Sequence, residues 1–260
     1  MTLLVGLIVV QMRAIPKVIH YCWFGRNPLP ESAVKCINSW KKYFPDYEIK
    51  EWNEDNFDVN IIPYTQQAYS AKKYAFVSDY ARMWILYHYG GLYFDTDVEV
   101  IKPMDDIVAR GPFMGIEVEM KNTEIPLINP GLGLGTIHGL TLYKDIIDYY
   151  SKIHFYNEDG SLNQVTIVKH VTGILENKGL THTNELQQLE GVWIYPRDYF
   201  NPLDDNTGRL LITENTRSIH WYTKTWLNKQ HPVRTWIVRR IHRYFGNNSL
   251  TWLKKLFNNK

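Results

Sequence analysis

Short apolar runs and segments of helical spacing follow one another from residue 17 onward. Residues 17–24 are rich in β-branched and aromatic side chains, which predicts a buried strand. Apolar positions then recur at helical spacing over residues 31–44 and stop before Pro45. Residues 47–52 alternate like a second strand. A strand, a helix and a strand this close together predict a βαβ unit, and therefore a parallel sheet in an α/β fold.

The longest helical pattern covers residues 66–89, which contain no proline or glycine and precede Gly90-Gly91. Residues 92–100 (LYFDTDVEV) are then predicted as one strand interrupted by acids. Further strands are predicted at residues 112–118 and 192–195, and further helices at 140–150 and 164–177. No internal repeat or low-complexity linker divides the chain.

Three segments describe the expected domain organisation: residues 1–14 as an N-terminal extension, 15–228 as one α/β domain, and 229–260 as a basic tail. The apolar run at residues 3–10 is shorter than the ~20 residues that span a bilayer and follows no lysine or arginine. It fits a short hydrophobic anchor, a buried strand, or residues upstream of a start at Met12. We favour the last, since the ordered pattern begins at Ile15, and leave open whether residues 1–11 belong to the native protein.

The composition is that of an ordinary globular protein, with 45% hydrophobic and 22% charged residues, which argues against disorder. Aromatic residues make up 14% of the chain. They fill cores and can form flat platforms for sugars and bases. The two cysteines exclude a disulfide framework and a cysteine-rich zinc module. They fit a reducing compartment, so we expect a cytoplasmic protein.

The net charge of +2 conceals an asymmetry: residues 1–214 carry 19 basic and 27 acidic residues, whereas residues 215–260 carry 10 basic and no acidic ones. In the tail, one apolar stripe includes Val233, Trp236 and Ile241 at helical spacing. Basic amphipathic helices of this kind suit an anionic membrane surface, which predicts a peripheral position on the inner face of the cell membrane. The alternative is a helix pair packed on the body with a solvated basic face. We expect no nucleic-acid partner.

A pair of acids supplies the first candidate chemistry. Asp95 and Asp97 are two residues apart, so on an ideal strand they project to the same face. Two carboxylates this close repel each other unless a cation lies between them, and the usual cation is Mn²⁺ or Mg²⁺ holding a diphosphate. The alternative is that both acids solvate an edge or a turn. The apolar neighbours favour a buried strand, where unpaired acids are costly.

Asp79 and Arg82 form a second charged pair, three residues apart on one face of the long helix. They fit a surface ion pair of little energetic value. They also fit an arginine directed at a phosphate or sugar hydroxyl, with Asp79 accepting hydrogen bonds from hydroxyls. The apolar surroundings of Asp79 favour the second interpretation.

These motifs together resemble the DXD-containing sugar-transferase family, which includes bacterial capsular-polysaccharide glycosyltransferases and fungal Golgi mannosyltransferases. The resemblance covers roughly residues 15–226 and implies a GT-A-type fold with a mostly parallel central sheet. The residues that carry it are Ile15-Pro16-Lys17-Val18-Ile19-His20, Trp23-Phe24-Gly25, Ser78-Asp79, Arg82, Tyr87, Gly90-Gly91, Tyr93 and Asp95-Thr96-Asp97.

The resemblance also implies metal ligands. It implies that Asp97 coordinates the metal directly and that Asp95 contacts the ribose and the metal. His220 lies in a late segment that resembles the part of the family closing over the diphosphate, and it is expected to add a metal ligand. Thr225 stands where the family has a serine and keeps the hydroxyl.

For the donor, the resemblance implies that Asp79 and Arg82 hold the sugar and its phosphate. Trp23 is the platform for the base, although a tryptophan at a strand end is equally often a core residue. Tyr93 lines the same pocket, and Trp226 contacts the nucleotide sugar. Residues 129–135 line the sugar and acceptor side.

We therefore expect a retaining, metal-dependent glycosyltransferase. Its donor is a nucleotide-diphosphate sugar, with UDP-sugars favoured over GDP-sugars. Its acceptor is a glycan or lipid-linked glycan in capsule or surface-polysaccharide synthesis. One alternative is a metal-dependent phosphoesterase, which usually needs more acidic and histidine ligands than two strand acids and a distant histidine supply. Another is a non-catalytic carbohydrate-binding or membrane scaffold protein.

Overall fold

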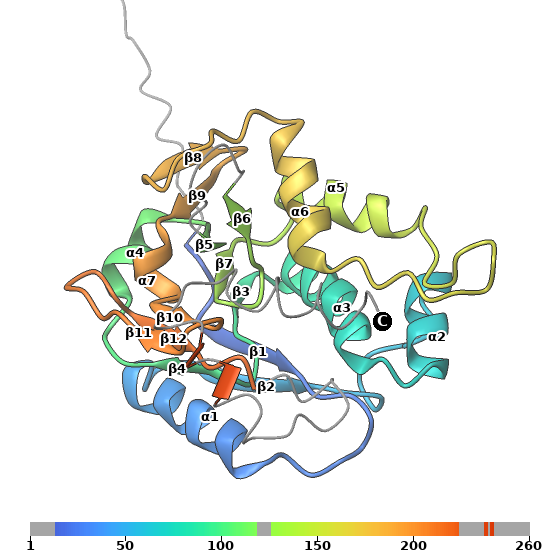
Figure 1. Ribbon diagram of the computed structural model, residues 1–260, viewed down its shortest axis with the longest axis horizontal. Coiled ribbons are helices and arrows are strands. Elements are labelled where there is room, and N and C mark those ends of the chain that lie inside the picture. Colours follow the sequence, from blue (N-terminus) through green and yellow to red (C-terminus); the bar gives the residue numbers. More distant parts are fainter. Residues whose placement is uncertain (1–13, 119–125, 224–236, 239, 242–260) are drawn as a thin grey trace, which may run out of the picture.

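A computed structural model describes residues 14–118 and 126–223, together with residues 237, 238, 240 and 241. Figure 1 shows helices on both sides of a central sheet. The eight strands of this sheet run in the order β2-β1-β3-β7-β5-β9-β8, with β6 paired to β5. Its members are β1 (Val18–Cys22), β2 (Glu48–Trp52), β3 (Gly91–Tyr93), β5 (Phe113–Val118), β6 (Leu127–Ile128), β7 (Leu134–Thr136), β8 (Gln187–Leu189) and β9 (Val192–Tyr195).

Most strands of the sheet point in one direction. β1 is parallel to both β2 and β3, and β5 is parallel to β9. β7 is antiparallel to β3 on one side and to β5 on the other, so the two parallel groups have the same orientation. Five of the eight strands are therefore aligned, and the expected α/β fold with a mostly parallel central sheet is confirmed. The strands predicted at residues 17–24, 47–52, 112–118 and 192–195 are present.

The single strand predicted at residues 92–100 is wrong. The chain forms β3, leaves the sheet, and pairs again as β4 (Val98–Val100) with β12 (Ser218–His220) in a separate two-stranded sheet. A turn separates the two strands, in which the Val98 N–H donates to the Asp95 carbonyl at 3.0 Å. The two acids therefore lie in a turn at the carboxyl end of β3, and not on a strand.

The helices are α1 (Glu31–Tyr43), α2 (Pro63–Ser70), α3 (Tyr74–Tyr89), α4 (Asp105–Arg110), α5 (Thr141–Tyr150), α6 (Ile167–Glu176) and α7 (Arg197–Phe200). The one helix predicted over residues 66–89 is wrong, because Lys72 adopts a left-handed conformation with φ 57°. The Lys73 N–H then donates to the Ala68 carbonyl and the Lys72 N–H to the Tyr69 carbonyl, as in a glycine-type helix end. The chain reverses there, and α2 packs against α3.

Alternation along the strands builds two hydrophobic cores, one on each face of the sheet. In β3, Tyr93 belongs to the core that α2, α3, α5 and α6 cover, and Leu92 to the core that α1, α4 and α7 cover. In β5, Met114 belongs to the first of these cores and Phe113 to the second. The sheet is thus buried on both faces. A hairpin of β10 (Leu203–Asp204) and β11 (Arg209–Leu210) completes the described elements.

Some sequence-based predictions concern residues outside the described part. They concern Trp226, the extension up to residue 13 and nearly all of the basic tail. The proposed division at residues 14/15 and 228/229 stays a prediction. Within the described residues, no helix combines the length and the apolar character that crossing a bilayer requires.

Candidate active site

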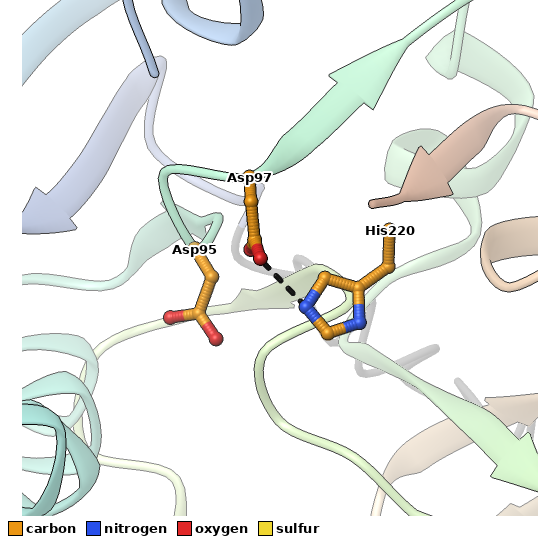
Figure 2. A group of neighbouring side chains, drawn as sticks. All are labelled: Asp95, Asp97 and His220. Atoms are coloured by element: carbon orange, nitrogen blue, oxygen red, sulfur yellow. Dashed lines mark ion pairs between the residues drawn. The ribbon is translucent and has the colours of Figure 1, made fainter. Parts of the chain in front are cut away.

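Three side chains expected to bind a metal converge at the carboxyl end of β3. Asp95 and Asp97 come from the turn after this strand, and His220 comes from the end of β12. Figure 2 shows the Asp97 carboxylate and the His220 ring facing each other, with Asp95 beside them. Each offers a ligand atom, and these atoms lie within 4.8 Å of one another. Two carboxylates with an imidazole fit a divalent cation, and the oxygen-rich set suits Mn²⁺ or Mg²⁺.

Strand pairing explains how a residue so distant in sequence reaches the acids. β12 is antiparallel to β4, with His220 opposite Val98, so His220 lies beside the turn that carries Asp97. The Trp221 N–H then donates to the Asp97 carbonyl at 3.0 Å. The His220 Nε2 atom lies 3.1 Å from Asp97 Oδ1.

Thr223 holds the second oxygen of the same carboxylate. Its backbone N–H donates to Asp97 Oδ2 at 2.9 Å, and its hydroxyl donates to this atom at 3.1 Å. Burial opposes ionisation of Asp97, but the His220 charge and the Thr223 bonds outweigh it, so the pKa of Asp97 lies below its usual value. Burial also works against a charged His220, yet Asp97 raises the pKa of this imidazole. In the metal-free site, each of these two groups therefore favours the charged form of the other.

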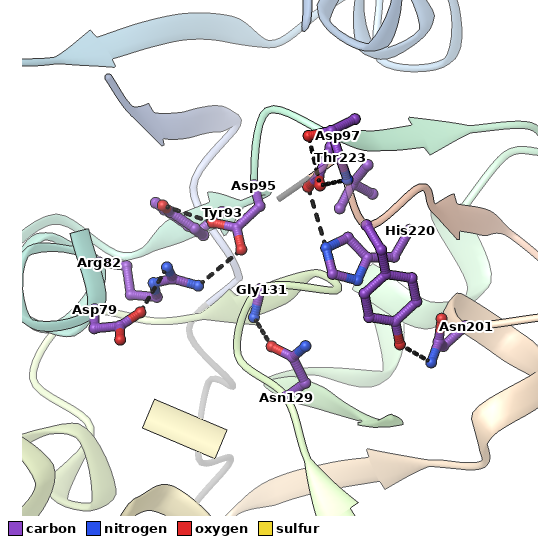
Figure 3. Close-up of polar contacts among 12 residues, drawn as sticks. Asp79, Arg82, Tyr93, Asp95, Asp97, Asn129, Gly131, Asn201, His220 and Thr223 are labelled. Atoms are coloured by element: carbon purple, nitrogen blue, oxygen red, sulfur yellow. Dashed lines mark hydrogen bonds and ion pairs between the residues drawn. The ribbon is translucent and has the colours of Figure 1, made fainter. Parts of the chain in front are cut away.

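Asp95 is fixed by a different set of donors, drawn in Figure 3. Arg82 donates through Nη1 to Asp95 Oδ2 at 3.2 Å, and the Tyr93 hydroxyl donates to Oδ1 at 3.1 Å. The guanidinium group also lies over the Tyr93 ring, 4.9 Å from its centroid. Tyr93 therefore joins the site through Asp95 and Arg82. Its expected contact with the nucleotide sugar stays a prediction.

Arg82 links the two acidic positions of the site. Its NH2 group donates to Asp79 Oδ1 at 3.0 Å, and its Nε donates to the Ser78 carbonyl at 3.2 Å. The side chain is only 4% exposed. The predicted pair on one helix face is thus present, and it is buried. The structure directs Arg82 at two carboxylates, and its role toward a phosphate stays a prediction.

Asp79 lies in a strongly desolvated position. Burial raises the pKa of its carboxyl to about 7, and Arg82 counteracts part of this effect. The Ile167 N–H, at the first residue of α6, donates to the carboxylate. Asp79 therefore takes the place of the side-chain cap that α6 lacks.

His20 positions the strand that leads to the acids. Its Nδ1 accepts a hydrogen bond from the Trp52 indole at 3.0 Å, so its Nε2–H donates to the Gly90 carbonyl at 3.0 Å. Burial lowers the pKa of His20 to about 4, so the ring is neutral. Gly91 packs so closely on Val18 and His20 that a Cβ atom there would overlap with Val18. The histidine and the paired glycines of the motif thus hold β1 and β3 together.

A loop after β6 supports Asp95 from the other side. Asn129 Oδ1 accepts the Gly131 N–H at 2.6 Å, and the Gly131 carbonyl accepts the Asp95 N–H at 3.2 Å. Thr172 on α6 accepts the Ile128 N–H at 2.9 Å and so ties the start of this loop to the helix. Sequence reasoning missed Thr223 and the support from Gly131. The Gly131 contact and one of the two Thr223 contacts come from backbone groups, which leave little signal in side-chain patterns.

Trp23 lies at the same edge of the sheet as the acids, because it follows β1, which is parallel and adjacent to β3. Its ring is half-buried against the core beside α1, and its indole N–H donates to the Asn27 carbonyl at 2.6 Å. Glu54 holds the following turn by accepting the Gly25 N–H at 2.7 Å and the Tyr69 hydroxyl at 2.9 Å. A role as base platform stays a prediction.

Comparison with known proteins places this geometry in context. Residues 30–114 match the family described as the glycosyltransferase sugar-binding region containing a DXD motif. The match includes Asp79, Arg82, Asp95 and Asp97, and it ends well before His220.

Two curated relatives and one solved structure illustrate the similarity. Inositol phosphoceramide mannosyltransferase 1 of Schizosaccharomyces pombe is 31% identical over 115 residues, which are 40% of this chain and 34% of the relative. The chain therefore spans about a third of that protein's length. An uncharacterised glycosyltransferase of Acanthamoeba polyphaga mimivirus is 26% identical over 204 residues, or 72% and 75% of the two chains. The structure of PaToxG glycosyltransferase, 19% identical, covers 64% of this chain and 70% of its own, with a TM-score of 0.47.

Proposed function

We propose that this chain is a metal-dependent hexosyltransferase, because residues 30–114 match the family described as the glycosyltransferase sugar-binding region containing a DXD motif. It moves a sugar from a nucleotide-diphosphate donor to a glycan or lipid-linked glycan, with retention of configuration at the anomeric carbon. The observation that carries the proposal is the convergence of Asp95, Asp97 and His220 within 4.8 Å at the carboxyl end of β3. Ligands of α/β sheets bind at this edge.

The metal site of the proposal consists of Asp95, Asp97 and His220, with Mn²⁺ favoured over Mg²⁺. A bound divalent ion supplies positive charge for the departing diphosphate. The protein prepares this site before any ligand arrives. Arg82 and Tyr93 orient Asp95, and Thr223 orients Asp97, so the protein holds both carboxylates in place.

Cleavage of the bond between the anomeric carbon and the phosphate builds positive charge on the sugar. In the proposed mechanism, Asp79 accepts hydrogen bonds from the sugar hydroxyls, and Arg82 keeps the neighbouring negative charges balanced. We assign no residue as a nucleophile for a double displacement. A same-face substitution accounts for retention: the acceptor hydroxyl enters on the side that the diphosphate leaves, and its proton passes to that departing diphosphate.

The choice of donor and acceptor rests on more indirect support. We favour UDP-sugars over GDP-sugars, while the name mannosyltransferase of the fungal relative keeps mannose as the competing donor sugar. The same name includes inositol phosphoceramide, a lipid, which supports a lipid-linked acceptor. Synthesis of capsule or another surface polysaccharide fits an acceptor of this class.

The basic tail supports a position at a membrane. Residues 215–260 carry 10 basic and no acidic residues, so they are attracted to anionic lipid. We place the protein in the cytoplasm, peripheral on the inner face of the cell membrane. Flotation with liposomes of anionic lipid tests this part, and deletion of residues 232–260 should abolish the binding. Equal flotation of the full and shortened chains would contradict it.

Nucleotide release from a panel of UDP- and GDP-sugars, with and without Mn²⁺, tests the main proposal. We expect metal-dependent release of the nucleoside diphosphate from one donor, and loss of both metal dependence and release in Asp97→Asn. The matched control is Asp105→Asn, an exposed acid in the first turn of α4. Release of inorganic phosphate from phosphate esters would support the phosphoesterase, and no turnover of any donor would support the scaffold. Full activity of Asp97→Asn would refute the site.

A further inference from the structure

Tyr222 has an unusual backbone conformation next to the candidate metal site. Its φ of 50° lies in the left-handed region, which a bulky side chain rarely occupies. Such conformations persist only where the surrounding contacts enforce them, and they are concentrated at functional sites. The question is which contacts hold Tyr222 and what the conformation accomplishes.

The backbone turn at Tyr222 brings two groups onto one carboxylate. His220 precedes it and lies 3.1 Å from Asp97 Oδ1, while Thr223 follows it and donates to Asp97 Oδ2 at 2.9 Å. A residue in the extended conformation between them would carry the Thr223 N–H away from Asp97. The left-handed turn therefore allows both ends of this short segment to bind Asp97.

The Tyr222 side chain covers the imidazole of His220. The two ring centroids are 4.2 Å apart, with an angle of 49° between the planes. The Tyr222 hydroxyl accepts a hydrogen bond from Asn201 Nδ2 at 2.6 Å, and the same amide donates to the Glu117 carbonyl at 2.7 Å. Asn201 is 1% exposed and follows α7, so it is a rigid anchor. In Figure 3, Asn201 lies on the side of His220 away from Asp97.

His220 lacks the support that histidine ligands ordinarily have. A metal-ligating imidazole normally donates its second ring N–H to a carboxylate or a carbonyl, which fixes the orientation of the ring. Here the Nδ1 atom is buried and has no hydrogen-bond partner among the described residues. The ring orientation therefore depends on Asp97 at Nε2 and on packing against Tyr222.

We propose that Tyr222, anchored by Asn201, is a positioning residue that holds the His220 ring for metal binding in place of the usual hydrogen bond. This inference rests on the proposed metal site. It assigns to Asn201 and Tyr222 a role in metal affinity, although neither is a ligand. Loss of an outer support of this kind typically lowers metal affinity about 10- to 100-fold.

Mn²⁺ binding without any donor tests the inference, with calorimetry for the affinity and pulsed EPR for the nitrogen coupling of a bound imidazole. In the wild type we expect this coupling, and His220→Ala should abolish it. Tyr222→Leu removes the ring and should weaken Mn²⁺ binding about tenfold or more while altering the coupling. Tyr222→Phe keeps the ring but loses the anchor, and should have an intermediate effect. Tyr199→Phe, a tyrosine on α7, is the matched control and should match the wild type.

The outcomes separate this inference from the proposed function. A wild-type chain that binds Mn²⁺ without nitrogen coupling would overturn the role of His220 and the inference together. Wild-type affinity and coupling in Tyr222→Leu would overturn the inference alone and leave the metal site intact. Unchanged behaviour of Tyr222→Phe would overturn the anchoring role of Asn201. Tyr222→Phe removes only the hydroxyl group and keeps the ring. This variant therefore still tests the inference if Tyr222→Leu fails to fold.

Discussion

Gly131 packs directly against Asp95, and a Cβ atom at this glycine would overlap with Asp95 Oδ2. The Gly131 carbonyl accepts the Asp95 N–H in the same contact. Asp95 is therefore positioned by a neighbour that must have no side chain.

Gly131→Ala should displace the Asp95 carboxylate. We expect Mn²⁺ affinity to fall about tenfold or more, with destabilisation of about 1–3 kcal/mol from overpacking. Calorimetric titration and urea unfolding measure the two effects. Gly173→Ala is the control, because no atom lies within 4 Å of a Cβ there and the site is in α6. Wild-type affinity in Gly131→Ala would show that the contact does not position Asp95.

Arg82→Met should destabilise the fold strongly. The substitution leaves Asp79 and Asp95 without the guanidinium group that lies 3.0 and 3.2 Å from them. Removing one partner of a buried ion pair typically costs about 3–5 kcal/mol, and Arg82→Lys restores only part because an ammonium cannot bridge both acids. Urea unfolding measures the loss. The control is Arg26→Met, an exposed residue paired with Asp55, where little change is expected. Equal losses in the two variants would contradict the bridging role.

Stability should fall as the pH drops below about 6.5, in part because of His20. Burial lowers the pKa of His20 from 6.5 to about 4, so the unfolded chain takes up this proton at a higher pH than the folded chain. The contribution is fully present above pH ~6.5 and is lost as the pH falls toward 4, by about 2 kcal/mol at pH 5. Unfolding by urea at pH 7 and pH 5 should give a smaller difference for His20→Asn than for the wild type. His170, whose pKa burial also lowers, is present in both proteins. An equal loss of stability between pH 7 and pH 5 in the two proteins would refute the assignment of this loss to His20.

Glu54→Ala should raise the donor KM about fivefold with little change in kcat, because Glu54 holds the turn after Trp23 through the Gly25 N–H. Steady-state nucleotide release over a range of donor concentrations measures this split. Asp55→Ala removes only an exposed ion pair with Arg26 and is the neighbouring control. An unchanged KM would argue against Trp23 as the base platform.

Several elements were predictable because their signals are local. The apolar run at residues 17–24 and the alternation at 47–52 correspond to β1 and β2. The spacing of Asp79 and Arg82 on a helix correctly places them on one face, where they form an ion pair. Side-chain periodicity is sufficient in these cases, because neighbouring residues in one element determine which groups meet.

Other features escaped prediction because their causes are not local. The helix break at Lys72 involves a left-handed lysine, where sequence rules expect glycine or asparagine. The strand predicted at residues 92–100 divides between two sheets, because β4 pairs with β12 from near residue 220. Asp95 and Asp97 therefore lie close together because of a turn, and not because alternate residues of one strand face the same side.

Residue order and spacing alone thus specify an α/β chain with a paired-aspartate motif and an adjacent aspartate–arginine pair. Tertiary structure decides which groups surround those charges. His220, Thr223 and Gly131 reach the acids, and Tyr222 packs on His220, only because β12 pairs with β4 and the loop after β6 folds against the turn. Such contacts arise from long-range backbone pairing and close packing. The whole fold determines which residues meet, and these residues are not separated by any regular spacing in the sequence.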